Sequence, residues 1–289
     1  MEEKSLEAIV SEPNNTRDAI MLALRSPSGE RTTWVIVEAE DDYAVYSKFM
    51  HPDTTTVKTS RDIDGKMGYS HVEKIVEDIK KEVSYAHIVG IRDADYTRYE
   101  DTEHIFPQNI FITDHRDLEM MMISSESVQH ELRHWAAGYE QATELCLNVC
   151  RHFGYLRIFN HVKQLNCTFH NNVEINKCWD DNSHSLKPNW KDECTSKFFL
   201  SINTTVIEDD LESFIKKKNL EQEDFLDICR GHDYLSLLSK TLIHTNIYSP
   251  KTIMSHMSNS YSYKDFMKTR LFAEIKKWQE KEDVTALAS

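Results

Sequence analysis

The sequence is poor in the residues that make turns. Only seven glycines and six prolines occur among its 289 residues. A loop-rich all-β protein uses many more of both, so this scarcity favours long helices. No run of about 18 apolar residues occurs, so we expect no membrane-spanning helix. The acidic start, Met1–Lys4, has no apolar stretch of the signal-peptide kind, so we expect a cytoplasmic protein.

Positive charge is also scarce. The chain has 34 Lys and Arg against 48 Asp and Glu, a formal net charge of −14. This balance opposes non-specific binding to nucleic acid, which depends mostly on Lys and Arg against phosphate. A nucleic-acid enzyme of this composition therefore needs metal ions that cancel acidic charge locally, or clustered basic residues. The acidity also fits a partner protein with a basic surface.

The six cysteines lack the CxxC spacing of zinc ribbons, so free buried thiols in a reducing compartment are the simpler interpretation. Cys146, Cys150 and His152 fall on one stretch of helical pattern and are an alternative zinc-binding set. No second ligand pair at a fitting distance completes a tetrahedral zinc site.

Apolar runs and helical patterns alternate between residues 33 and 113. The expected strands are Thr33–Glu38, Thr54–Thr59, Ala86–Ile91 and Asn109–Thr113, and the expected helices are Thr16–Arg25, Asp41–Met50 and Tyr69–Val83. We expect a turn at Ser26–Gly29. The alternation predicts an α/β fold with a mostly parallel sheet flanked by helices, in a first domain of residues 1–125.

Residues 126–289 form a second expected region, which is mainly helical. Ser127–Asn166 is almost continuously helix-compatible, and Gly154 is a candidate break. A polar insertion occupies residues 167–196, and Lys197–Asn203 is a candidate strand. Further helices are expected at Asp209–Lys218, Gln222–Arg230, Tyr234–His244 and Tyr263–Glu280.

Acidic residues follow three of the expected strands. Glu38 ends the first strand, Asp93 and Asp95 follow the third, and Asp114 follows the fourth. Residues i and i+2 of an extended chain point to one side, so Asp93 and Asp95 can aim at one point. Glu38 on a neighbouring strand can approach them, and three such carboxylates repel one another unless a cation lies between them. Hard oxygen ligands suit Mg²⁺ or Mn²⁺.

Other residues around this cluster have two interpretations each. Asp42, Asp114, Asp117 and Glu119 are candidates for a second metal or for substrate contact. Asp41 or Asp42 can instead cap a helix, Asp95 can be a turn residue, and Glu119 can complement a helix dipole. Arg92, Arg98, Arg116 and His232 are candidate phosphate contacts. Gly231 as a helix C-cap and Asp233 as the next N-cap would leave His232 as a packed surface histidine.

The arrangement resembles the Toprim signature, in which a Glu ends the first strand and a DxD pair ends a later one. Four blocks extend the resemblance over most of the chain: residues 37–46 (VEAEDDYAVY), 90–96 (GIRDADY), 112–122 (ITDHRDLEMMM) and 229–238 (CRGHDYLSLL). Together they are similar to OLD-like Toprim nucleases of bacterial anti-phage defence, among them the effectors of the PARIS system. Ala39 stands where Toprim proteins usually have glycine.

The resemblance implies that Glu38 is the general acid or base and that Asp93 and Asp95 hold magnesium. It also implies a toxic effector that an ABC-type ATPase holds inactive and that, once released, dimerises and cleaves host tRNA. A DNA-cleaving nuclease and a non-catalytic sensor subunit of an ATPase complex are the alternatives. A tyrosine nucleophile at Tyr96 is weaker, and the chain has no Walker motif for ATP hydrolysis.

Overall fold

The structure is a computed structural model, which describes residues 15–169, 173–202, 208–242 and 249–288. The chain divides into two compact units. The sheet unit comprises the described residues up to Asp93, Ile105–Thr113 and those from Phe266 onward, and the helical unit comprises Ala94–His104 and Asp114–Asp265. We expected one boundary near residue 125, whereas this division is discontinuous. Met1–Lys4 and His244, at the end of one expected helix, lie outside the described residues.

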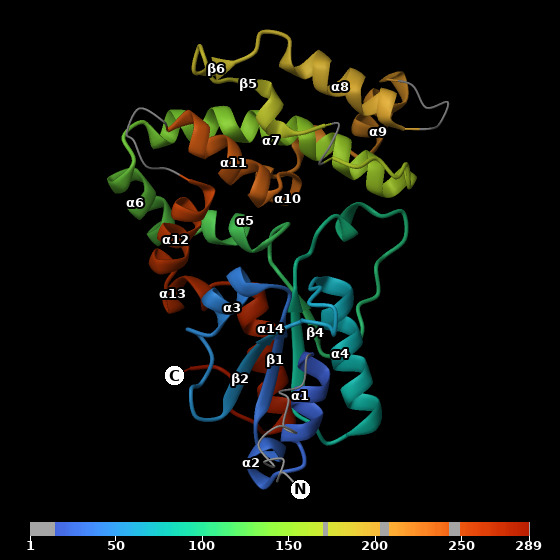
Figure 1. Cartoon of the computed structure of the whole chain (residues 1–289), viewed down its shortest axis with the longest axis vertical. Coiled ribbons are helices and arrows are strands. Elements are labelled where there is room, and N and C mark those ends of the chain that lie inside the picture. Colours follow the sequence, from blue (N-terminus) through green and yellow to red (C-terminus); the bar gives the residue numbers. More distant parts are fainter. Residues whose placement is uncertain (1–14, 170–172, 203–207, 243–248, 289) are drawn as a thin grey trace, which may run out of the picture. The chain divides into compact units, whose positions relative to one another are not determined.

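The sheet unit is built on four parallel strands in the order β2-β1-β3-β4 (Figure 1). Their bounds are β1 Thr33–Val37, β2 Thr55–Thr59, β3 Ile88–Arg92 and β4 Ile110–Ile112. Every residue of β1 and β3 is buried. Strands buried on both faces need no polar alternation, which is why the sequences of β1 and β3 are apolar except for Thr33 at the start of β1 and Arg92 at the end of β3. The predicted α/β class with a parallel sheet is therefore confirmed.

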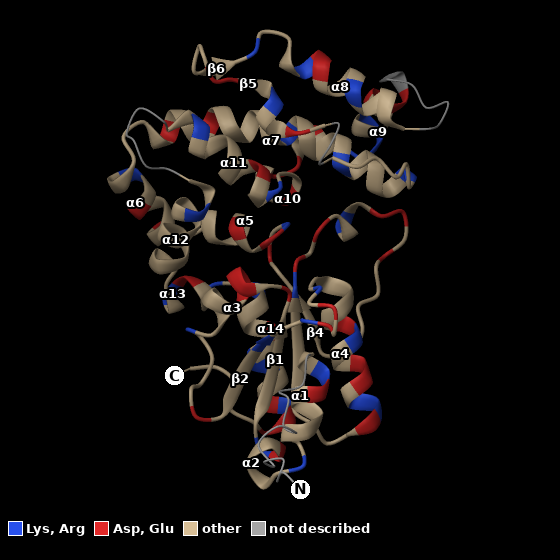
Figure 2. Cartoon of the chain, viewed as in Figure 1, with Lys and Arg blue, Asp and Glu red and all other residues tan. Residues whose placement is uncertain are grey.

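Helices cover the sheet on both faces. Their bounds are α1 Thr16–Ala23, α2 Pro27–Glu30, α3 Glu40–Tyr46, α4 Tyr69–Glu82 and α14 Arg270–Glu282. Helices α1 and α4 enclose an apolar core against Trp34 and Ile36 of β1 and Ile88 of β3. Helix α3 contacts β2, and α14 contacts β4. Figure 2 shows charged residues along α4, while the strands carry almost none.

Two local predictions in this unit need adjustment. Residues 26–29 were expected as a turn, but α2 forms there because Ser26 accepts the Gly29 N–H at 3.1 Å and Pro27 occupies the first turn. The C-terminal helix was expected with the second region. It belongs to the sheet unit, where the chain after it pairs back through Met50 and Leu287.

The strand order places a switch point between β1 and β3. After β1 the chain adds β2 on one side, and after β2 it returns to add β3 on the other side of β1. In open parallel sheets, ligands bind at the carboxyl ends of strands where the order reverses in this way. The residues directly after β1 and β3 are Glu38 and Asp93.

The helical unit has one long helix with shorter ones around it. Its helices are α5 Leu118–Ile123, α6 Glu126–Trp135, α7 Tyr139–Lys163, α8 Trp190–Ser201, α9 Glu208–Lys217, α10 Phe225–Ile228, α11 Gly231–Thr241 and α12 Pro250–Ser260. Helix α13, Tyr263–Phe266, crosses the boundary to the sheet unit. Short 3-10 turns are η2 Thr97–Tyr99, η3 Ile175–Cys178 and η4 Leu220–Gln222, and strands β5 Trp179–Asp180 and β6 Ser185–Leu186 pair antiparallel.

The expected helix break at Gly154 was wrong. Helix α7 runs through Gly154, and the break is at Gly138, whose φ of +78° suits glycine. Gly154 instead allows a close approach, because a Cβ there would lie 2.5 Å from the Ile228 carbonyl oxygen. The strand expected at Lys197–Asn203 was also wrong, because the residues from Lys197 to Ser201 belong to helix α8. Asn203 lies outside the described residues. None of the described helices is long and apolar enough to cross a membrane.

Candidate active site

Glu38 and Asp93 meet at the carboxyl edge of the parallel sheet. The Asp93 backbone N–H donates a hydrogen bond of 2.9 Å to Oε1 of Glu38. Strands β1 and β3 are in register up to Val37 and Ile91, so the residues beyond them emerge side by side. Both side chains are half-buried. The carboxylate of the first-strand glutamate therefore contacts the third-strand aspartate through the Asp93 backbone.

The backbone at Glu38 is fixed by its surroundings. The Ser60 hydroxyl, which is fully buried, donates to the Glu38 carbonyl at 2.9 Å, and the Ser60 N–H donates to Val37 O at 2.8 Å. On the other side, Asp42 Oδ2 accepts the Ala39 N–H at 3.0 Å. Ala39 is the N-cap of α3 but has no side chain that could accept an N–H of the first turn. Asp42, in that turn, accepts the N–H of Ala39 itself, as the acidic residue of a capping box does. This contact accounts for Asp42 structurally.

Arg92 lies inside the sheet unit. Its side chain is 2% exposed, its guanidinium donates to Glu73 at 2.5 Å, and it stacks over the Tyr69 ring at 4.2 Å. Its Nε also donates to the Asp93 carbonyl at 3.1 Å. These partners disfavour a phosphate contact, and they hold the backbone at the end of β3.

Asp95 belongs to the helical unit and is paired with Arg116. Its φ of +48° is left-handed, its N–H donates to Arg116 O at 2.9 Å, and its Oδ1 accepts from Arg116 Nη2 at 3.2 Å. The Arg116 guanidinium lies over the Tyr96 ring at 4.5 Å. Because the left-handed conformation turns the chain, the assumption that Asp93 and Asp95 share one extended segment does not hold.

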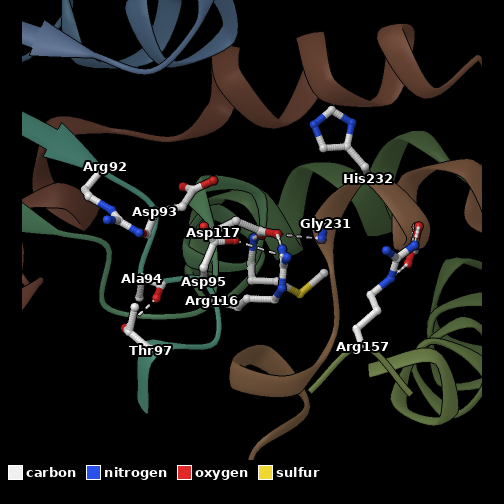
Figure 3. Close-up of polar contacts among 12 residues, drawn as sticks. Arg92, Asp93, Ala94, Asp95, Thr97, Arg116, Asp117, Arg157, Gly231 and His232 are labelled. Carbon is white, nitrogen blue, oxygen red and sulfur yellow. Dashed lines mark hydrogen bonds and ion pairs between the residues drawn. The ribbon is translucent and has the colours of Figure 1, made fainter. Parts of the chain in front are cut away.

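Asp117 is the most enclosed of the predicted site residues, with 2% of its surface exposed. It caps α5, with Oδ1 accepting the Met120 N–H at 3.1 Å. Its Oδ2 accepts the Gly231 N–H at 2.8 Å and pairs with Arg116, as Figure 3 shows. Both oxygens are thus used by the protein, and a metal ion would have to displace these partners.

Gly231 begins α11 rather than ending the preceding helix, so its expected C-cap role was wrong. A Cβ at Gly231 would lie 2.8 Å from Asp117 Oδ1 and would also collide with Glu119. Glycine therefore lets α11 start against α5. Asp233 lies in the first turn of α11 and is not its N-cap, which is Arg230.

Glu119 and His232 lie next to each other in the helical unit. Glu119 is in the first turn of α5 and its side chain is 8% exposed, whereas the His232 side chain is 65% exposed. His232 Nε2 is 3.4 Å from Glu119 Oε1. Of the residues predicted to contact phosphate, His232 thus has a side chain that is accessible to a ligand. Asp114 is half-buried, and its carbonyl accepts a hydrogen bond from Arg98.

The two alternative sites find little support. Tyr96 is buried, and burial raises its pKa, which opposes a phenolate nucleophile. Burial likewise raises the pKa of Cys146 to about 12, so its metal-binding thiolate form is disfavoured. His152 faces away to another partner, with Nε2 2.9 Å from the Thr195 hydroxyl.

Sequence reasoning missed two charge clusters in the helical unit. Asp227 pairs with Arg98 and lies 3.2 Å from His115 Nδ1. Arg157 of α7 holds Asp233 of α11 through two hydrogen bonds, of 2.9 and 3.1 Å. Asp227 is 129 positions from Arg98, and Arg157 is 76 positions from Asp233. Their sequences therefore carried no signal of these long-range pairs.

Among the residues that the structure describes, no group of three or more His, Cys, Asp or Glu is arranged to hold a metal ion. The hard-oxygen chemistry of Glu38 and Asp93 fits a divalent cation, while Asp95 is engaged with Arg116. A scan of the sequence against protein-family models finds no match, and a search of curated proteins finds none either.

Proposed function

We propose that this protein is a divalent-metal-dependent nuclease of the Toprim type. The observation that carries the proposal is the hydrogen bond from the Asp93 N–H to the Glu38 carboxylate, at the switch point of a parallel sheet. It brings together the two acidic residues that the Toprim signature puts at the ends of its first and later strands. A site at this edge also has the location expected for ligand binding in such sheets.

Glu38, Asp93 and Asp95 are the residues that would hold Mg²⁺ or Mn²⁺. Asp95 follows Asp93 by two residues, so the backbone limits their Cα separation to about 7 Å. A bound divalent ion supplies Lewis acidity that polarises a phosphodiester. Glu38, oriented by the Asp93 N–H, accepts the proton of the attacking water.

Asp95 must change partner for this role. Its carboxylate is paired with Arg116, which also neutralises Asp117. A metal ion would replace the guanidinium at Asp95, while Arg116 keeps its contact with the buried Asp117. The guanidinium of Arg116 reduces the repulsion between Asp95 and Asp117, since adjacent acids otherwise repel one another.

The substrate that the resemblance implies is tRNA, and the biological role is growth arrest during phage infection. An ABC-type ATPase would keep the nuclease inactive, and the released chain would act as a homodimer. The net charge of −14 supports docking on a basic protein surface. Because the chain as a whole is acidic, substrate phosphate would have to be bound by individual side chains near the site. His232, whose side chain is exposed, is one candidate.

The test uses the full chain with Mn²⁺ calorimetry and with Mg²⁺-dependent cleavage of labelled total tRNA. We expect Glu38→Gln to lower the cleavage rate on the order of 10²–10⁴-fold, as for loss of a general base. Asp93→Asn should lose both cleavage and Mn²⁺ binding. Glu40→Gln is the matched control, because Glu40 is exposed and pairs only at the surface with Arg61.

Cleavage at the wild-type rate by Glu38→Gln would overturn the assignment of the base. A non-catalytic subunit would be favoured by two results together. The wild-type protein would release no heat with Mn²⁺, and Glu38→Gln and Asp93→Asn would still cause growth arrest. Plasmid DNA in a parallel reaction separates a DNA nuclease from a ribonuclease. Circular dichroism of each variant ensures that a loss of activity is not a loss of fold.

A further inference from the structure

Two cysteine sulfurs lie in contact in the helical unit. Sγ of Cys178 and Sγ of Cys194 are 3.1 Å apart. Cys178 is the last residue of η3 and Cys194 lies in α8, and these two elements contact each other. Both residues are buried, with 1% and 5% of their surfaces exposed, and both are free thiols in this structure. Packing thus holds two thiols from different elements together.

Three of the other four cysteines are placed differently. Cys146 contacts the Thr241 hydroxyl at 3.5 Å, Cys167 contacts the Ser201 hydroxyl at 2.9 Å, and Cys229 donates to the Leu147 carbonyl at 3.6 Å. Their partners are oxygen atoms, with which no disulfide forms. The Cys178–Cys194 contact is therefore not a general consequence of burying cysteines in this unit.

We propose that Cys178 and Cys194 are a redox-modification site that forms a reversible intramolecular disulfide. A disulfide has an S–S length near 2.05 Å, so the sulfurs need to approach by only about 1 Å. The two residues are 16 positions apart, and the hairpin of β5 and β6 lies between them. The bond would close this segment and join η3 to α8.

The chemistry balances with a peroxide as the oxidant. The Cys194 thiolate attacks one peroxide oxygen, which breaks the O–O bond, releases hydroxide and leaves a sulfenic acid. The Cys178 thiolate then attacks the Cys194 sulfur and displaces the second hydroxide. Two protons from the thiols convert the hydroxides to water. The sulfurs together lose two electrons and the peroxide gains two.

The surroundings support Cys194 as the attacking group. The hydrogen bond with Cys178 lowers the pKa of Cys194, and the charge of Lys197 on the same helix also lowers it, which together outweigh the opposite effect of burial. The thiolate is the reactive form, so this favours Cys194 over the other buried thiols. Cys146 and Cys229, in contrast, have their pKa raised by burial.

Oxidation would stiffen one part of the helical unit. The Lys187 N–H already donates to the Cys178 carbonyl at 2.9 Å, and Lys240 of α11 pairs with Asp181 in the hairpin at 2.7 Å. A covalent bond between η3 and α8 would restrict their separation during local opening. Amide exchange in both elements should therefore slow several-fold on oxidation.

The experiment treats the reduced full chain with hydrogen peroxide, blocks the remaining thiols in denaturant and maps peptides without reduction. We expect two of the six thiols to be lost, one linked peptide pair containing Cys178 and Cys194, and recovery of both thiols with dithiothreitol. Cys178→Ser and Cys194→Ser should each lack the linked pair, while Cys167→Ser keeps it.

Six titratable thiols after peroxide treatment, or a linked pair that joins other cysteines, would overturn the proposal. Peptide mapping of the wild-type chain decides this even if a serine variant does not fold. Hydrogen exchange adds a second measurement. Oxidised wild-type protein should exchange more slowly at η3 and α8 than reduced protein, and Cys194→Ser should show no such difference.

Discussion

The core between the sheet and helices α1 and α4 is apolar apart from the Arg92–Glu73 pair at the end of β3, whereas several buried charged pairs help to hold the helical unit together. In the sheet unit, Glu38 and Asp93 stand half-buried at strand ends. In the helical unit, Asp117 and Asp233 are at most 7% exposed, and each is paired with an arginine. Acidic residues that look alike in sequence therefore fall into two groups, those buried against arginine in the helical unit and those half-buried at the ends of parallel strands.

The largest effect that this comparison predicts is for Asp117→Ala. It removes the cap of α5, the acceptor of the buried Gly231 N–H and one of the two carboxylates that pair with Arg116, so we expect a loss of about 3 kcal/mol in the free energy of unfolding. Asp93→Asn in the sheet unit should cost less than about 1 kcal/mol. Urea titrations of both variants give the values, and equal costs would contradict the comparison.

Gly231→Ala comes next. The added methyl group would meet Asp117 and Glu119, so we expect a loss of about 3 kcal/mol, as for overpacking of a tight contact. Gly65→Ala in the sheet unit is the control. Gly65 has a φ of +78° but open space around its Cβ position, so strain alone should cost about 1 kcal/mol. A smaller cost at Gly231 than at Gly65 would show that α5 and α11 can move apart.

The pH dependence of stability tests the buried polar groups of the helical unit. Burial lowers the pKa of His152 from 6.5 to about 4. Between pH 6.5 and about 4, His152 is protonated in the unfolded chain but neutral in the folded chain. The stability that is present above pH 6.5 is therefore lost as the pH falls towards 4. The loss is on the order of 3 kcal/mol at the lower end of that window.

His152→Gln should remove this part of the pH dependence. Urea unfolding of both proteins at pH 7.5, 5.5 and 4.5 gives the comparison. As the pH falls, the free energy of unfolding of the wild type should decrease more than that of the variant. Parallel curves for the two proteins would mean that His152 accepts its proton in the folded state.

The smallest predicted effect concerns Arg116. Lysine keeps the positive charge near Asp117 but cannot bridge two carboxylates with a planar fork. We expect Arg116→Lys to release Asp95 and to tighten Mn²⁺ binding about fivefold, which corresponds to roughly 1 kcal/mol. Arg157→Lys is the control, because Arg157 is bound by two hydrogen bonds to Asp233 in the same helical unit. Weaker binding in Arg116→Lys would mean that Arg116 supports the site.

Much of the sheet unit could be predicted from sequence. Strands β1 to β4 and helices α1, α3 and α4 lie within a few residues of their expected positions, because buried parallel strands and amphipathic helices have strong local patterns. Strand alternation predicted that Glu38 and Asp93 stand at the carboxyl ends of parallel strands, and the structure adds that β1 and β3 are neighbours. The helical unit was harder to predict, since Gly154 and Gly231 have roles set by Ile228 and Asp117, which are distant in sequence.

The sequence by itself determined that the chain forms a parallel sheet with acidic residues at its carboxyl edge, since short-range apolar periodicity specifies both. Only the tertiary structure decided which carboxylates remain at that edge. Asp117 pairs with Arg116 and accepts the Gly231 N–H, while Asp95 adopts a left-handed backbone conformation and pairs with Arg116. Such partners depend on which helices pack together, and packing follows from the whole chain rather than from any local pattern.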